Sequence, residues 1–175
     1  MAVPPRAVHL MCGLTGAGKT TLARRLERTH HAVRFSIDEW MIRLYGQQMP
    51  REQFDERHEA CEGLIWDVSR RLLALDVDVI LDFGFWTRQK RAKFKRLIEA
   101  EGSTPILYVH DLPLEVLRER LQQRNRSRPE SAFEITEEML RAFALQFESP
   151  EGDEGFQVIR VGRDSLMGER HSPRG

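Results

Sequence analysis

The chain has little cysteine and no long apolar run, and both absences narrow the class of protein. Cys12 and Cys61 are its only cysteines, too few for a disulfide framework, so we expect reduced thiols in a packed interior. No stretch of 18 apolar residues occurs, so we expect no membrane-spanning helix. The short apolar stretch near the N-terminus runs directly into a glycine-rich motif, so we expect a strand there and no signal peptide. We therefore expect a cytoplasmic protein.

Net charge is also absent, because 27 basic side chains balance 27 acidic ones. Domains that bind nucleic acid are usually basic, so this balance weighs against that class, although a local basic patch stays open. The sequence also lacks the Asn-Lys-x-Asp motif of GTPases, a Gly-x-Ser-x-Gly nucleophile elbow and a His/Cys pair at metal-ligand spacing. Its 175 residues suffice for one packed domain, expected at residues 1–162, followed by a loose tail at 163–175.

What the chain does contain is a P-loop motif, Gly-Leu-Thr-Gly-Ala-Gly-Lys-Thr, at residues 13–20. An apolar segment leads into it and apolar residues at helical spacing follow it, as a strand-to-helix turn requires. The glycines allow the loop N–H groups to point inward around phosphates, while Lys19 can reach the β- and γ-phosphates and Thr20 can bind Mg²⁺. We therefore expect a phosphate site formed by Gly13, Leu14, Thr15, Gly16, Ala17, Gly18, Lys19 and Thr20.

Strand-like and helix-like patterns alternate along the rest of the chain. Strands are expected at residues 7–12, 33–37, 77–81, 105–109 and 156–161. Helices are expected at residues 19–29, 51–76, 87–101 and 136–147, with a short helical segment around Trp40 and another helix beginning at Pro113. This alternation predicts an α/β fold with a parallel sheet covered on both faces. Because ligands bind at the carboxyl ends of such strands, Asp38, Asp82 and His110 should face the same crevice as the P-loop.

Two carboxylates follow strands and are candidates for chemistry. Asp38 can take the proton of an acceptor hydroxyl, or it can cap the next helix, and Arg43 one turn later can hold a substrate or lie on a solvated face. Asp82 can organise Mg²⁺, hydrogen-bond the acceptor or cap a loop expected at residues 82–86. Trp86 belongs to an aromatic cluster in that loop, which can line an acceptor pocket or pack in the core.

A dense run of arginines follows the fourth expected strand. It comprises Arg118, Arg120, Arg124, Arg126 and Arg128, and we expect a loop from residue 124 to residue 131. Arg120 and Arg124 are four residues apart and would share one face of a continued helix. Cationic donors on a closing lid stabilise the charge of a transferring phosphoryl group, so we interpret this run as an arginine-rich lid.

Together these residues resemble the small P-loop kinases of the zeta-toxin, chloramphenicol-phosphotransferase, gluconate-kinase and polynucleotide-kinase group, over roughly residues 7–161. The resemblance implies ATP and Mg²⁺ bound at residues 13–21, with Thr21 included, and Asp38 as the base. It implies acceptor contacts from Arg43 and Asp82, lid arginines at Arg120 and Arg124, and adenine contacts from Asn125 and Arg126. It also implies a five-stranded parallel sheet of order 2-3-1-4-5. Asp82-Phe83-Gly84 departs from the Asp-Asn-Thr of polynucleotide kinases, and the lid departs from that of gluconate kinases, so the resemblance is to the superfamily.

The leading hypothesis is therefore an ATP-dependent phosphotransferase acting on a hydroxyl of a small molecule, with Lys19, Asp38, Arg120 and Arg124 as catalytic residues. Thr20 and Asp82 are the candidate metal ligands, and Arg43, Asp82 and Trp86 are the candidate acceptor contacts together with Asp38. Two alternatives stay open: a nucleotide-dependent switch, and a kinase acting on the 5′-hydroxyl of a polynucleotide. The acceptor and the oligomeric state are not defined by the sequence.

Overall fold

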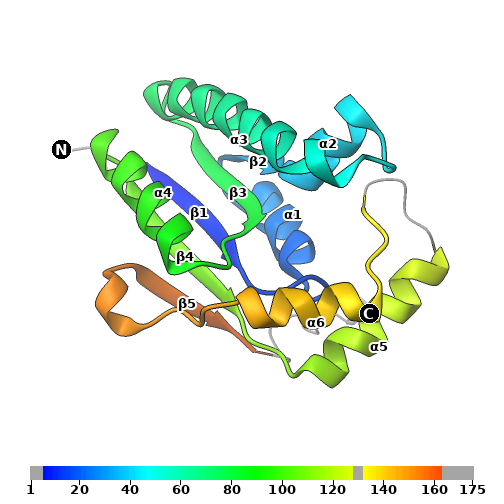
Figure 1. The fold of residues 1–175 in the computed structure, drawn as a ribbon. Helices are drawn as coiled ribbons and strands as arrows, with labels where there is room; N and C mark the ends of the chain where they lie inside the picture. Colours follow the sequence, from blue (N-terminus) through cyan, green and yellow to red (C-terminus); the bar gives the residue numbers. More distant parts are fainter. Residues whose placement is uncertain (1–5, 128–131, 163–175) are drawn as a thin grey trace, which may run out of the picture.

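A computed structural model describes residues 6–127 and 132–162. Its centre is a parallel sheet of five strands in the order β2-β3-β1-β4-β5, which confirms the expected fold class and strand order (Figure 1). The strands are β1 (Ala7–Cys12), β2 (Ala32–Ser36), β3 (Asp78–Gly84), β4 (Thr104–His110) and β5 (Gln157–Val161). Residues 163–175, where a loose tail is expected, and Arg128 lie outside the described residues.

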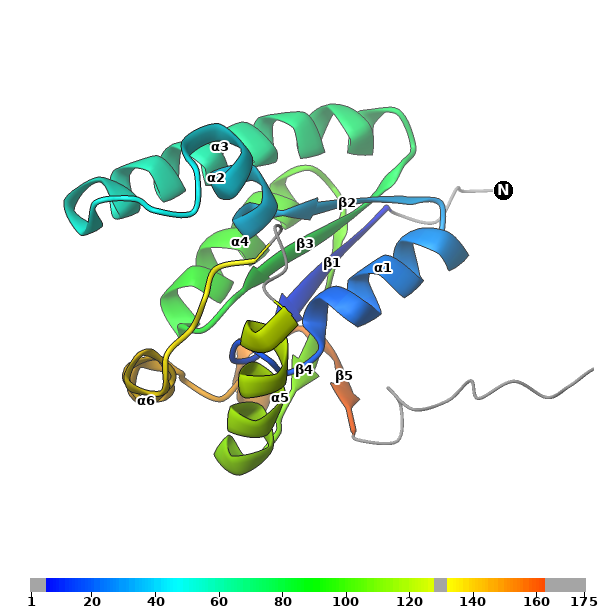
Figure 2. The ribbon, with the colours of Figure 1, turned by 90° about the vertical axis from the view of Figure 1, so that its right-hand side faces the viewer.

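Helices lie on both faces of this sheet. They are α1 (Lys19–Thr29), α2 (Ile37–Tyr45), α3 (Arg51–Ala74), α4 (Arg88–Ala100), α5 (Leu114–Ser127) and α6 (Glu137–Gln146), with a 3₁₀ turn η1 (Gly152–Glu154). In Figure 2, α1 lies on one side of the sheet, while α3 and α4 lie on the other. The helices α5 and α6 lie near the end of the sheet where the P-loop emerges from β1. In the part of the chain that the structure describes, no helix is long and apolar enough to cross a membrane.

Burial explains why β1 occupies the middle of the sheet. Its residues from Val8 to Cys12 are all buried, because strands flank it on both edges and helices cover both faces. Alternate side chains enter different cores. Leu10 and Cys12 pack with the side chains of the α3 and α4 face, whereas Met11 packs with Leu22 of α1. The start of the P-loop is therefore held by a rigid central strand.

A third apolar cluster connects the P-loop to the helices that follow β4. It comprises Leu14, Ala17, Leu117, Leu121, Ile135 and Leu140. The first two belong to the loop, the next two to α5, and the last to α6. Because of this cluster, α5 and α6 pack directly on the loop, and the arginines of α5 are brought to the carboxyl end of the sheet.

Two expected boundaries, the end of the third strand and the loop from residue 124, were wrong, and the alternative that Asp38 caps a helix is also wrong. The strand β3 does not end at residue 81 but continues through Asp82 and Phe83 to Gly84, pairing Ser36 with Asp82 and Cys12 with Gly84. The helix α2 is capped by the Ser36 hydroxyl, which accepts from the Glu39 N–H, so Asp38 lies inside the first turn and is not the cap. The helix α5 extends to Ser127 and includes Arg124, where a loop was expected.

Candidate active site

The P-loop takes a shape that only glycine permits at its first position. Gly13 has φ of 144°, and a Cβ there would lie 2.7 Å from the backbone oxygen of His110. Gly18, at the start of α1, has φ of 92° in the left-handed region. The loop therefore passes close to the end of β4 and leads directly into the N-terminus of α1, where the unpaired backbone N–H groups of a helix favour phosphate.

Neighbouring elements hold the loop from behind. The Gly13 N–H donates to the Gly84 oxygen at 3.0 Å, and the Trp86 indole N–H donates to the Gly13 oxygen at 3.0 Å. His110 Nδ1 lies 3.2 Å from the Ala17 oxygen, which fits a neutral ring that carries its proton on Nδ1. Burial, with help from the Lys19 charge, lowers the pKa of His110 to about 4. The sequence placed His110 at the end of a strand but gave no sign of this supporting role.

Lys19 lies at the centre of the site. Its ammonium donates to the Leu14 oxygen at 2.8 Å, so it folds back over the loop. Burial lowers its pKa, and the negative charges of Asp82 and then Asp38 oppose that shift, while Arg124 adds to it. These interactions bring together side chains from α1, α2, β3 and α5. Lys19, Asp38, Asp82 and Arg124 thus lie near enough for their charges to act on the Lys19 ammonium, and their convergence on a bound phosphate stays a prediction.

Asp38 lies in the first turn of α2 and is exposed to solvent. Desolvation raises the pKa of its carboxyl above the ordinary value, against the opposing effect of the Lys19 ammonium. A carboxylate with a raised pKa is a better base near neutral pH than an ordinary one. The position and the shift are both suited to accepting a proton, which is the role predicted from the sequence.

Asp82 carries an ion pair that sequence reasoning missed. Its side chain is buried, and Arg34 Nη1 of β2 lies 3.3 Å from its Oδ2. The Arg34 Nη2 also donates to both oxygens of Glu39 at 2.8 Å. The only signal in the sequence was a single charged residue between Val33 and Phe35 in a strand pattern. Since Arg34 occupies one carboxylate oxygen, Asp82 can act on metal-bound water more readily than as a direct ligand.

The arginines of α5 divide into two groups. Arg124 points to the loop: its Nη1 lies 3.5 Å from the Thr15 hydroxyl, its Nη2 donates to the Phe133 oxygen at 3.1 Å, and its buried Nε has no hydrogen-bond partner among the described residues. Arg120 is half-buried, and its charge acts on His110, so it lies on the same side. Asn125 instead donates to the Ile135 oxygen at 2.8 Å, and Arg126 is exposed. The adenine contacts predicted for Asn125 and Arg126 stay predictions.

The remaining predicted residues are Thr20, Thr21, Arg43 and Trp86. Thr20 is half-buried and Thr21 exposed in the first turn of α1, and Arg43 is exposed near the end of α2. The Trp86 ring packs on Phe143 of α6, with centroids 4.7 Å apart, and its N–H is already bound to the loop. Acceptor contacts from Arg43 and Trp86 stay predictions.

The oxygen atoms available at this site suit a Mg²⁺ ion that binds together with a nucleotide. Thr20 supplies a hydroxyl oxygen and Asp82 a carboxylate, both of them hard ligands, and Mg²⁺ in nucleotide sites takes few protein ligands beside phosphate and water. No cluster of three or more His, Cys, Asp or Glu side chains suited to holding a metal occurs within residues 6–127 and 132–162. Any metal at this site is therefore expected to be held jointly with the nucleotide.

Comparison with known proteins identifies the class. The chain belongs to a family of AAA domains, whose profile matches residues 8–150. No curated protein sequence gave a significant match.

Solved structures show the same fold at low sequence identity. Kti12 of Chaetomium thermophilum with ADP-AlF3 is 19% identical, with 90% of this chain and 89% of that chain covered and a TM-score of 0.72. A gluconokinase from Sinorhizobium meliloti 1021 is 15% identical, with coverage of 91% and 84% and a TM-score of 0.55. A chain of the Pnkp1/Rnl/Hen1 RNA repair complex is 22% identical at a TM-score of 0.61, with 84% of this chain covered and only 48% of that chain. The chain thus shares its fold with Kti12, with a gluconokinase and with part of an RNA repair complex.

Proposed function

We propose that the protein is an ATP-dependent phosphotransferase that moves the γ-phosphoryl group of ATP to a hydroxyl of a small molecule. One observation carries the proposal: Asp38, with a raised pKa, shares the electrostatic environment of Lys19 and Arg124. A nucleotide-binding switch has no need of a carboxylate base beside the phosphate lysine. The neighbours described as a gluconokinase and a sugar kinase support a small-molecule acceptor.

The proposed reaction gives each side chain of the site a role in phosphoryl transfer. The acceptor oxygen bonds to the γ-phosphorus, the bond from that phosphorus to the bridging oxygen breaks, and ADP leaves. The hydroxyl proton moves to a carboxylate oxygen of Asp38. Lys19 and Arg124 place positive charge on the phosphoryl oxygens, and Arg120 adds to it. Bound Mg²⁺, held by Thr20 and through water by Asp82, would neutralise phosphate charge.

The acceptor is proposed to enter beside α3 and residues 132–135. Phe54 of α3 stacks on His58 at a centroid distance of 5.8 Å and meets Phe133 edge-to-face at 6.0 Å. The Phe133 oxygen also accepts from Arg124, so the residue that meets α3 is tied to the lid arginine. We propose that this contact forms one wall of the acceptor space.

A phosphoryl-transfer assay tests the proposal. The protein is incubated with ATP, Mg²⁺ and a panel of sugars, nucleosides and antibiotics, and products are analysed by mass for the gain of one phosphate. Asp38→Asn should lower transfer by about 10² to 10⁴ because it removes the base but keeps the shape. Asp67→Asn, at an exposed position on α3, is the matched control. Full transfer by Asp38→Asn would show that the assigned mechanism is wrong.

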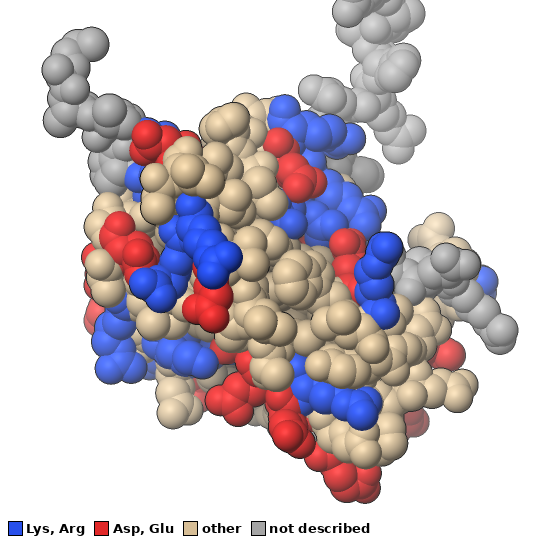
Figure 3. Space-filling model, turned by 90° about the horizontal axis from the view of Figure 1, so that it is seen from above, with Lys and Arg blue, Asp and Glu red and all other residues tan. Residues whose placement is uncertain are grey.

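The neighbour from an RNA repair complex supports a second candidate, a kinase for polynucleotide ends. The balance of 27 basic and 27 acidic side chains weighs against it, since domains that bind nucleic acid are usually basic. On the face that Figure 3 shows, Lys and Arg are interspersed with Asp and Glu. Binding through many phosphates weakens steeply with salt. Transfer to an oligonucleotide that falls steeply between 50 and 200 mM salt (roughly the range over which such contacts weaken) would favour this candidate, whereas salt-insensitive transfer to a small acceptor would exclude it.

A further inference from the structure

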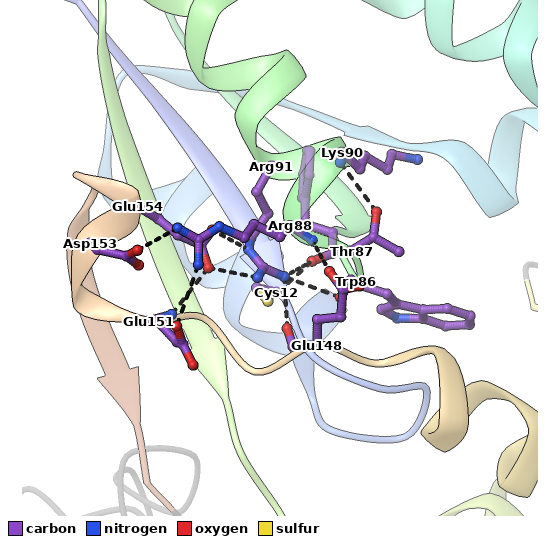
Figure 4. A network of polar contacts seen from close by, with 11 residues as sticks. Cys12, Trp86, Thr87, Arg88, Lys90, Arg91, Glu148, Glu151, Asp153 and Glu154 are labelled. Carbon is purple, nitrogen blue, oxygen red and sulfur yellow. Dashed lines mark hydrogen bonds and ion pairs between the residues drawn. The ribbon is translucent and has the colours of Figure 1, made fainter.

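A fully buried arginine lies behind the P-loop, outside the groups assigned to catalysis. Arg91 of α4 is 0% exposed. Its Nε and Nη2 each donate to one carboxylate oxygen of Glu154 at 2.7 Å, and its Nη1 donates to three backbone oxygens, those of Phe85, Trp86 and Glu148, at 2.9 to 3.1 Å (Figure 4). A buried guanidinium is tolerated only when its charge is paired and its donors are used, and both conditions hold here.

The carbonyl partners of Arg91 belong to the turn between β3 and α4. Gly84 has φ of 95°, and Phe85 has φ of 46°, which is costly for a residue with a bulky side chain. Arg91 binds the oxygens of Phe85 and Trp86, and the Glu148 N–H donates to the Trp86 oxygen at 2.9 Å. The strained turn is therefore held from both sides, by α4 and by the segment after α6.

The turn between β3 and α4 also binds the backbone N–H and the backbone oxygen of Gly13, the first residue of the P-loop. Gly84 accepts the Gly13 N–H, and Trp86 donates its indole N–H to the Gly13 oxygen. Phe143 of α6 covers the other side of the Trp86 ring. These contacts set the direction in which the loop leaves β1. They therefore also set the orientation of the loop N–H groups.

We propose that Trp86 is a positioning residue for the phosphate-binding loop, held in place by the Arg91–Glu154 pair. It acts through Gly13 and does not need to touch the nucleotide or the acceptor. The inference rests on the proposed function only in that ATP must bind at residues 13–21. Loss of the indole N–H leaves the Gly13 oxygen without that donor and allows the loop to adopt other conformations, which weakens binding of the triphosphate.

The test compares two tryptophan variants. Trp86→Phe removes the N–H and keeps a ring for Phe143, while Trp66→Phe makes the same change in the core between α3 and α4. ATP dissociation constants are measured by calorimetry with Mg²⁺ at a temperature where circular dichroism shows each variant folded. We expect about fivefold weaker ATP binding for Trp86→Phe, as one neutral hydrogen bond implies, and wild-type affinity for Trp66→Phe.

A second pair of variants tests the clamp without changing Trp86. Glu154→Gln weakens the pair with Arg91, and the matched control Glu62→Gln removes a carboxylate that pairs with Lys90 and Lys93 of the same helix. ATP binding should weaken about threefold or more in Glu154→Gln and stay unchanged in Glu62→Gln. If Trp86→Phe does not fold, this pair decides the question.

The outcomes separate the two proposals. Wild-type ATP affinity in both Trp86→Phe and Glu154→Gln overturns the positioning role, even if both variants melt at lower temperature, because a purely structural contact would change only stability. A wild-type protein that binds no ATP overturns the proposed function and this inference together. ATP binding that weakens as expected without transfer to any acceptor supports the inference and counts against the kinase reaction.

Discussion

At the scale of single residues, Asp38 shows how a site residue can oppose the stability of its own fold. Its folded-state pKa lies above the ordinary value because protein surrounds the carboxyl. Ionisation is therefore less favourable in the folded than in the unfolded chain. The contribution of this carboxyl to the free energy of unfolding is greatest below its pKa in the unfolded chain, and it is lost as pH rises through its pKa in the folded chain. At neutral pH the ionised Asp38 therefore lowers the stability of the protein without nucleotide.

We therefore expect Asp38→Asn to raise the midpoint of thermal unfolding at pH 7 while it lowers phosphoryl transfer by about 10² to 10⁴. The gain should shrink as pH falls and vanish below the ordinary carboxyl pKa, where the wild-type group is protonated in both states. Differential scanning calorimetry at several pH values checks this, with Asp67→Asn as the control. A lower midpoint for Asp38→Asn at pH 7 would contradict the raised pKa.

The residue scale is also where sequence reasoning was least complete. The P-loop residues were identifiable because their chemistry is local, written in eight consecutive positions. The pairing of Arg34 with Asp82 joins residues 48 positions apart, and no spacing in the sequence signals it. His110 and Trp86 likewise support the loop through contacts that only the folded chain brings together.

At the scale of helices and strands, prediction succeeded where one pattern dominated. The bounds of β1 and α1 were confirmed, because a continuous apolar run and then a helical period leave little choice. The end of β3 was wrong because charged Asp82 looked like the start of a loop. In the fold its charge is paired with Arg34, so the strand can continue through it. The arginines and glutamines of α5 are good helix formers, which explains why that helix extends past Arg124.

The long helix α3 contains a glycine, Gly63, beside open space. Gly63 is exposed inside the helix, and a Cβ there would meet nothing within 4 Å. Gly63→Ala should stabilise the protein by about 0.5–1 kcal/mol, because alanine loses less backbone entropy in a helix. Thermal unfolding should shift upward by roughly 2–4 °C per kcal/mol. Gly13→Ala, where a Cβ would meet His110, should do the opposite, and a lower midpoint for Gly63→Ala would refute the reasoning.

At the scale of the whole molecule, three histidines distributed over the fold link stability to pH. Burial is the main cause that lowers the pKa of His9, His58 and His110 from 6.5 to about 4 each. The unfolded chain therefore binds more protons between these values. The stability that the neutral rings provide is present above pH 6.5 and is lost as pH falls toward 4.

We expect the free energy of unfolding to fall by roughly 1 kcal/mol per pH unit for each histidine across this window. Urea denaturation at pH 7, 6 and 5 measures the slope. His9→Phe should reduce it by about one proton, since it removes the titrating ring and keeps an aromatic ring beside Tyr108. An unchanged slope in this variant would show that His9 does not contribute to the pH dependence of stability.

The buried guanidinium of Arg91 also has a consequence for the order in which the chain can be completed during synthesis. Its carboxylate partner lies 63 residues further along, close to the last strand. Until the ribosome has released Glu154, α4 carries a cation that cannot be buried without penalty, and the turn that orients the P-loop lacks its clamp. The phosphate site, although encoded near the N-terminus, is therefore among the last parts of the nascent protein to mature.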